Sequence, residues 1–295
     1  MKVAVIDVDG NHFPNLALMK LSAWHKQQGD EVEWWNGLKH YDVVYKSKVF
    51  DGLYTEDMEF CIQADRIVEG GTGYGLDNRL PEEIEHTCPD YDLYHIWDTA
   101  YGFLTRGCPR RCPFCIVSQK EGAASYQASE LTEFYHGQRE IVLLDPNLLA
   151  CPEAERLLQN LAESRAQVDL TQGLDIRLMD RDTIHLLNRI SFSRIRFAWD
   201  DPKEDLTDAF QQVARHTKLR DPARRVVYVL TNYGSSQEED LYRIYTLRDL
   251  GFSPYVMIYD KPNAPQNARD LQRWCNNRYI FHAEPDFSRY RRRSN

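Results

Sequence analysis

The chain has 295 residues, of which 42% are hydrophobic and 12% aromatic, so it is long enough for one large domain or two ordinary domains with a sizeable core. Its net charge of -9 and pI of about 5.5 exclude a protein that coats nucleic acid through a generally basic surface, although a local basic groove stays open. No stretch approaches the roughly 20 apolar residues of a membrane helix. The start of the chain is too short and too soon acidic for a signal peptide, and seven cysteines without a disulfide-like pattern indicate a reducing, cytoplasmic location.

Residues 1–98 predict a small, Rossmann-like α/β domain. Lys2–Val8 is an apolar, β-branched run typical of a buried parallel strand. Asn15–Gln28 has the apolar spacing of a helix, and Gly29 is a natural stop. Further strands are predicted at 31–35, 41–45 and 66–68. Strands that alternate with helices imply a parallel sheet.

A glycine-rich turn, Gly70–Gly75, follows the last of these strands. Such a turn at the carboxyl end of a strand lets backbone approach a ligand, or it serves only as a turn that needs positive φ. As a phosphate motif it is weak, because it does not follow the first strand of a dinucleotide fold. The next segment, Asp77–Asp98, is rich in Pro, Asp and Glu and predicts a connector.

Three cysteines then fall close together at Cys108, Cys112 and Cys115, with the spacing C-x-x-x-C-x-x-C. Short spacings let several thiolates of one loop converge on one metal centre, and thiolates are the soft ligands of iron–sulfur clusters. A cubane cluster has four irons, so three cysteines leave one iron open, and an open position usually means that chemistry happens there. A three-cysteine zinc loop is the alternative, although zinc motifs normally supply a fourth Cys or His at similar spacing.

Strands and helices alternate after the connector. The predicted strands cover 101–105, 140–145, 167–171, 194–199, 225–230 and 254–259. The predicted helices cover 151–165, 181–190, 206–217 and 237–250. Alternation of this kind fits either an open doubly wound sheet or a barrel.

The cysteine loop, including the aromatic Phe114 just before the third cysteine, resembles that of the radical S-adenosylmethionine (SAM) enzymes. This resemblance selects a partial (β/α)6 TIM-type barrel over residues 99–262, with 263–295 as a C-terminal helix and basic tail. It implies a 4Fe–4S cluster held by the three cysteines and SAM bound at the open iron. In the family, the reduced cluster passes an electron to the sulfonium of SAM, a carbon–sulfur bond breaks, and a 5′-deoxyadenosyl radical starts the reaction.

Ligands of α/β folds gather at the carboxyl ends of strands, and polar residues follow the predicted strands there. The resemblance implies that Asp145 and Asn147 hold the SAM amine, although either also suits a helix cap. Gln172 and Arg177 suit the SAM carboxylate, because Arg pairs bidentately with carboxylates. The remaining expected contacts are Asp175, which either pins Arg177 or faces the substrate, and Asp200, which binds the ribose or caps the next helix.

The N-terminal region is similar in layout to that of cobalamin-dependent radical SAM enzymes and of methylthiotransferases. The Asp-x-His-x-x-Gly ligand loop of the cobalamin enzymes is missing, and the loop after the first strand offers only His12. We therefore do not expect cobalamin.

The motifs indicate the initiating step, SAM cleavage, and leave the substrate open. One alternative is a methylthiotransferase-like or methyltransferase-like radical SAM enzyme acting on RNA or protein. Against it, the first domain has no second cysteine set, and no RNA-binding β-barrel follows residue 260. Another is a non-catalytic iron–sulfur or zinc protein that binds nucleic acid. The expected partners are a substrate and an electron donor such as flavodoxin or ferredoxin, without a membrane.

Overall fold

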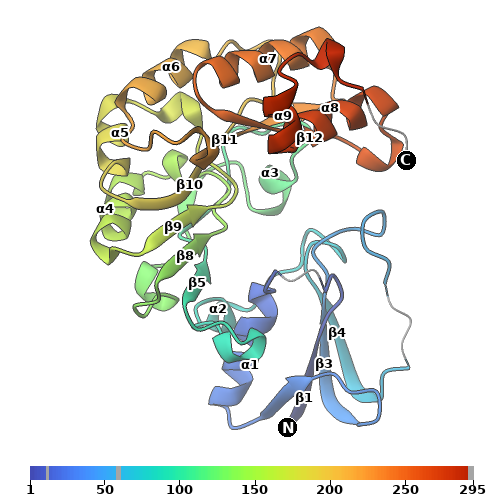
Figure 1. Ribbon diagram of the computed structural model, residues 1–295. Helices are drawn as coiled ribbons and strands as arrows, with labels where there is room; N and C mark the ends of the chain where they lie inside the picture. Colours follow the sequence, from blue (N-terminus) through green and yellow to red (C-terminus); the bar gives the residue numbers. More distant parts are fainter. Residues whose placement is uncertain (11–12, 58–60, 292–295) are drawn as a thin grey trace. The chain divides into compact units, whose positions relative to one another are not determined.

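The computed structural model describes residues 1–10, 13–57 and 61–291, so His12 lies outside the described residues. The protein is α/β, with one four-stranded and one six-stranded parallel sheet (Figure 1). This confirms the predicted class. The chain divides into two compact units, Met1–Leu144 and Asp145–Asn295. The domain boundaries predicted from the sequence stay predictions. Within the described part of the chain, no helix is long and apolar enough to cross a membrane.

The strands are β1 Lys2–Asp7, β2 Glu31–Trp34, β3 Tyr41–Ser47, β4 Ala64–Gly70, β5 Thr99–Gly102, β6 Thr105–Arg106, β7 Tyr126–Gln127, β8 Glu140–Leu143, β9 Gln167–Leu170, β10 Ser191–Ala198, β11 Arg225–Thr231 and β12 Ser253–Ile258. The α-helices are α1 Leu16–Gln27, α2 Glu82–Glu85, α3 Val117–Lys120, α4 Ala154–Ser164, α5 Arg181–Leu187, α6 Thr207–His216, α7 Gln237–Asp249, α8 Gln266–Asn276 and α9 Arg278–Ala283.

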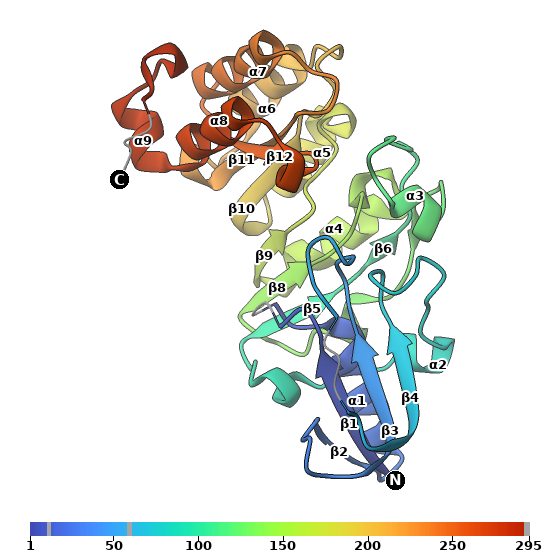
Figure 2. The same cartoon turned by 90° about the vertical axis from the view of Figure 1, so that its right-hand side faces the viewer.

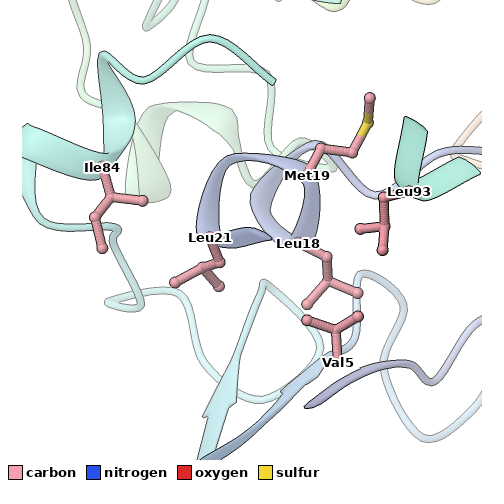
Figure 3. Packing of buried hydrophobic residues seen from close by; sticks show 6 residues of the cluster. All are labelled: Val5, Leu18, Met19, Leu21, Ile84 and Leu93. Atoms are coloured by element: carbon pink, nitrogen blue, oxygen red, sulfur yellow. The ribbon is translucent and has the colours of Figure 1, made fainter. Parts of the chain in front are cut away.

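The first sheet has the order β2-β1-β3-β4, and every pair in it is parallel. The helix α1 covers one face, where Val5 of β1 and Leu18 of α1 point toward one another (Figure 3). Ile84 and Leu93 of the connector complete this core, so the connector is a packed part of the first unit. Asn15 caps the start of α1, because its side chain accepts a hydrogen bond from the Leu18 N–H.

The second sheet has the order β12-β11-β10-β9-β8-β5 (Figure 2). The strands therefore follow one another in the sheet as they do in the chain, apart from the short β6 and β7, which form a separate antiparallel pair. The pairs β5–β8, β9–β10, β10–β11 and β11–β12 are parallel.

The edge strand β12 is covered by side chains of α8. Asn276 accepts a hydrogen bond from the Val256 N–H at 2.7 Å and donates one to its carbonyl at 3.0 Å. Gln272 donates to the same carbonyl at 3.1 Å. Asn276 thus pairs with both the N–H and the carbonyl of Val256, which are the groups that a further strand would bind at this edge.

Two predicted elements are wrong in their limits. The strand expected at 101–105 is divided into β5 and β6, because the chain leaves the sheet after Gly102. The Phe134 ring packs against Gly102 so closely that a Cβ there would lie 2.6 Å from the ring. The single C-terminal helix expected within 263–295 is α8 followed by α9. They are separated at Asn277, whose side chain accepts from the Tyr279 and Ile280 N–H groups and starts the second helix.

Candidate functional site

The cysteine loop extends from Gly107 to Ser125, between β6 and β7. These two strands pair antiparallel, with Thr105 opposite Gln127 and Arg106 opposite Tyr126. Gly107 has φ +76°, and a Cβ there would lie 2.0 Å from the Ala124 carbonyl oxygen. The two ends of the loop are therefore in backbone contact, which only glycine permits at this position.

Charged side chains fix these ends. Arg106 donates to Glu121 and to Glu85, both at 2.8 Å, and the Gly107 N–H donates to Glu121 at 3.2 Å. Lys20 of α1 reaches the same Glu85 carboxylate at 3.1 Å. Burial by itself lowers the pKa of Arg106, but the charges and hydrogen bonds of Glu85 and Glu121 have the larger effect and raise it. The base of the loop is thus a charge-balanced network linked to the first sheet through α1.

Cys108, Cys112 and Cys115 lie half-buried on this loop. The Cys108 N–H donates to the Gly122 carbonyl at 3.2 Å, and the Cys115 N–H donates to the Cys112 carbonyl at 3.0 Å, which closes a turn around Phe114. All seven cysteines of the chain are thiols. In the part of the chain that the structure describes, no three Cys, His, Asp or Glu side chains stand as a group that could hold a metal ion. The three thiols share a loop with fixed ends, and their donor chemistry suits iron–sulfur ligation.

Asp145 and Asn147 follow β8, and each is only 4% exposed. Asn147 precedes a 3-10 turn over Leu148–Ala150, yet its side chain makes no capping hydrogen bond there. The capping alternative is therefore not what the structure shows for Asn147. Both residues are buried polar groups at a strand end.

The turn after β9 is organised around Arg177. Asp175 accepts from the Arg177 guanidinium at 2.7 Å and from its backbone N–H at 3.2 Å, so it pins Arg177, which is one of its two expected roles. Glu204 binds the same guanidinium bidentately, with both bonds at 2.7 Å. These hydrogen bonds outweigh burial and raise the pKa of Arg177. Gln172 lies exposed on the same turn.

Arg243 of α7 is a buried centre that the sequence analysis missed. Its side chain is 1% exposed and donates to the carbonyls of Trp199 at 2.8 Å, Asp200 at 3.0 Å and Leu230 at 3.0 Å. Its counter-ion is Asp240, at 2.5 Å. Arg243 therefore ties together the carboxyl ends of β10 and β11. Its spacing from Asp240, on the helix stripe that also buries Ile244, is the signal that could have revealed it.

Asp200 lies beside this centre. Burial raises its pKa to about 6, although a backbone hydrogen bond at Leu230 and the charges of Arg243 and Arg177 oppose the change. A carboxyl group with this pKa gains or loses its proton near neutral pH, unlike an ordinary aspartate.

The last two strand ends are joined to each other. Asn232, at φ +62°, donates its side-chain amide to the Tyr259 carbonyl at 2.8 Å, and the rings of Tyr233 and Tyr259 meet edge to face at 4.7 Å. The hydrogen bond joins the ends of β11 and β12, and the two tyrosine rings place aromatic surface there. The strand-end residues of the second unit therefore include polar, charged and aromatic groups.

A cavity of about 190 Å³ lies elsewhere in the second unit. Its lining includes Ile184 of α5, Val213 of α6 and Ser191 and Phe192 at the amino end of β10. It is thus at the opposite end of β10 from Asp200 and does not include the expected site residues.

No model of a known protein family matches the sequence, and a search of curated proteins returns no significant match. The functional interpretation therefore depends on the motifs and the geometry of this chain itself.

Proposed function

We propose that the protein is a radical SAM enzyme with a partial (β/α)6 barrel. The observation that carries the proposal is the C-x-x-x-C-x-x-C spacing of Cys108, Cys112 and Cys115 on a loop closed at its base by β6 and β7. An anchored loop has fewer conformations to lose, which lowers the entropic cost of gathering its ligands around a cofactor.

The strand order supports the barrel. A doubly wound sheet reverses direction at a switch point, where its ligands bind. The order β5-β8-β9-β10-β11-β12 contains no such reversal. A sheet that adds each new strand on the same side is the arrangement from which a (β/α) barrel is built.

In this proposal the three cysteines bind a 4Fe–4S cluster, which supplies the electron that cleaves SAM. Asp145 and Asn147 accept hydrogen bonds from the SAM amine, and Gln172 donates to its carboxylate. Arg177 already has two carboxylate partners, so it contributes through its remaining N–H groups and through the positive charge it adds. Asp200 accepts from a ribose hydroxyl when it is ionised.

The first experiment tests the cluster. Anaerobically reconstituted protein should contain about four irons and four sulfides per chain and show the broad iron–sulfur absorption band. Replacing Cys108, Cys112 and Cys115 together by Ser should abolish the band, whereas Cys275→Ser, a buried thiol far along the chain, should keep it. A normal band in the triple variant would refute the proposal. Bound zinc without sulfide would favour the zinc alternative.

The second experiment tests SAM. The reduced protein should convert SAM to 5′-deoxyadenosine and methionine, slowly even without substrate, as followed by chromatography. Reduction by flavodoxin in place of dithionite tests the expected electron donor. A cluster that forms but never yields 5′-deoxyadenosine would indicate the non-catalytic alternative.

The third experiment tests the strand-end contacts. Asp145→Asn and Arg177→Gln should each weaken SAM binding about tenfold or more, because each removes one charge-assisted interaction of roughly 1.5–3 kcal/mol. The control is Asp182→Asn, the same chemical change in the first turn of α5. Unchanged affinity in both variants would show that SAM is held by other residues, even if the cluster assignment stands.

A further inference from the structure

The carboxyl edge of the first sheet carries two groups that the proposed function does not use. β3 ends at Ser47 and is followed by Lys48, and β4 ends at Gly70 and continues into the Gly70–Gly75 turn. The two strands are parallel neighbours, so both segments lie at the same edge (Figure 2). Ligands of parallel sheets bind at this edge.

The glycine turn is pressed against the segment after β3. Gly71 has φ +91°, and a Cβ there would be 2.3 Å from the Lys48 carbonyl oxygen. A Cβ on Gly73 would be 2.2 Å from the Phe50 carbonyl oxygen and 2.7 Å from Cγ of the Lys48 side chain. The Gly73 N–H donates to the Lys48 carbonyl at 2.8 Å. The side chain of Lys48 therefore lies along the turn.

Lys48 is buried without a carboxylate partner. It is 5% exposed, and its amine faces the Tyr74 ring with 5.7 Å to the ring centroid. Lys46, two residues earlier, faces the same ring but also pairs with Asp57 at 3.1 Å and Glu69 at 3.0 Å. Among the described residues Lys48 has no such ion pair. Asp57 and Glu69 thus form their direct ion pairs with Lys46, and Asp57 acts on Lys48 only through its charge at longer range.

A second lysine reaches the turn from the cysteine loop. Lys120, the last residue of α3, donates a hydrogen bond to the Thr72 hydroxyl. Burial lowers its pKa, and within the described ranges it forms no ion pair with a carboxylate. Two partly or fully buried ammonium groups therefore meet one glycine turn, and among the described residues neither forms a direct ion pair, although the charge of Asp57 acts on Lys48 and that of Glu121 acts on Lys120. This is costly unless an anion completes the arrangement.

Exposed apolar side chains continue from Lys48. Phe50, Leu53 and Tyr54 are each about half exposed. The segment that carries them is held in place by Asp9, which accepts from the Val49 N–H at 2.6 Å and from the Thr55 hydroxyl at 2.9 Å. Exposed apolar side chains beside ammonium groups without a direct ion pair suit a ligand with an anionic end and a flat apolar end.

We propose that this edge binds a nucleotide, with its phosphate at Lys48, Lys120 and the Thr72 hydroxyl and its base against the apolar side chains after Lys48. Lysine acts as a point charge toward phosphate, and glycine lets phosphate oxygens approach the backbone. The proposal does not rest on SAM chemistry, because none of its residues is an expected cluster ligand or SAM contact.

The test is calorimetric titration of the full chain with AMP, adenosine and inorganic phosphate. AMP should bind at least tenfold more tightly than either fragment. Lys48→Met and Lys120→Met, which keep the apolar stem, should each weaken AMP binding about tenfold or more. The control is Lys39→Met, since Lys39 pairs with Glu33 at 2.7 Å and lies before β3, at the other end of the sheet.

Three results would overturn the proposal. The first is no heat of binding with AMP at millimolar concentration, and the second is unchanged AMP affinity in both lysine variants. The third is equal affinity for AMP and inorganic phosphate, which would exclude a role for the base. If Lys48→Met does not fold, two other measurements decide the question. Lys120→Met should weaken AMP binding, and AMP should raise the melting temperature of the unmodified protein. The triple Cys→Ser variant should still bind AMP, which separates this site from the cluster.

Discussion

The cysteine loop and the strand ends of the second unit use charge in opposite ways. At the base of the loop Arg106 joins Glu85 and Glu121, and the three thiols lie beyond this pairing. In the second unit Arg177 follows β9 and Arg243 reaches the strand ends from α7, and both have carboxylate partners from their own unit. The loop's charges support potential ligands, whereas the strand-end charges mostly support one another.

This difference matters for how polar strand ends are interpreted. An arginine near the proposed site of the SAM carboxylate suggests that it binds this carboxylate directly. Arg177, however, already donates three hydrogen bonds from its guanidinium to Asp175 and Glu204. Its first role is to hold the turn after β9 against the segment after β10. Experiments that remove one charge at a time can show whether each region is primarily structural.

The largest effect is expected at Arg243. Arg243→Met should lower the free energy of unfolding by about 3–5 kcal/mol, because it leaves Asp240 buried without its partner. Urea denaturation measures this. The double variant Arg243→Met with Asp240→Leu should recover much of the loss. If Arg243→Met unfolds like the unmodified protein, the second unit does not depend on this internal pair.

Asp200 should make stability depend on pH. Its pKa is about 6 in the folded protein against an ordinary value of 3.8, so the native state keeps a proton that the unfolded chain has released. Stability should therefore fall as pH rises from about 4 to about 6, by roughly 2–3 kcal/mol, and stay level above that.

Asp200→Asn should remove this contribution, because the amide does not titrate in this range. The measured quantity is the difference in the free energy of unfolding between the variant and the unmodified protein at pH 4.5 and at pH 7.5. A difference that is the same at both pH values would contradict the assignment.

The smallest effect compares two glycines of the cysteine loop. Gly107 and Gly122 both have positive φ, so Ala at either position costs about 1–2 kcal/mol. Only at Gly107 would the new Cβ strike backbone, whereas at Gly122 nothing lies within 4 Å. Gly107→Ala should therefore cost about 1–3 kcal/mol more and reduce the iron retained after reconstitution. Equal losses in the two variants would show that the base of the loop is not tightly closed.

Most of the regular elements follow from the sequence. The strand β11 and the helix α7 lie within a residue of their predicted limits, because an apolar, β-branched run and a capping box at Ser236 mark them locally. The pair β6–β7 could not be predicted, since two-residue strands carry no periodicity. Their pairing depends on contacts across the loop, such as Arg106 with Glu121.

The candidate site was predictable in part for the same reason. Cysteine spacing is local and needs no partner, so the loop could be recognised directly. Glu204 lies 27 residues from Arg177, and nothing in the sequence near either residue shows that they pair. Lys48 and Lys120 likewise approach the same glycine turn from distant parts of the sequence, and nothing in the sequence near either lysine shows this.

The Asn276 contact with Val256 also bears on how the protein behaves at high concentration. An uncovered edge strand is a template for strands of other molecules and leads to aggregation. Because one amide side chain satisfies both backbone groups of Val256, and Pro254 removes a further donor, β12 offers little to an incoming strand. The helix α8 thus covers backbone groups of β12 with which a strand of another molecule would otherwise pair.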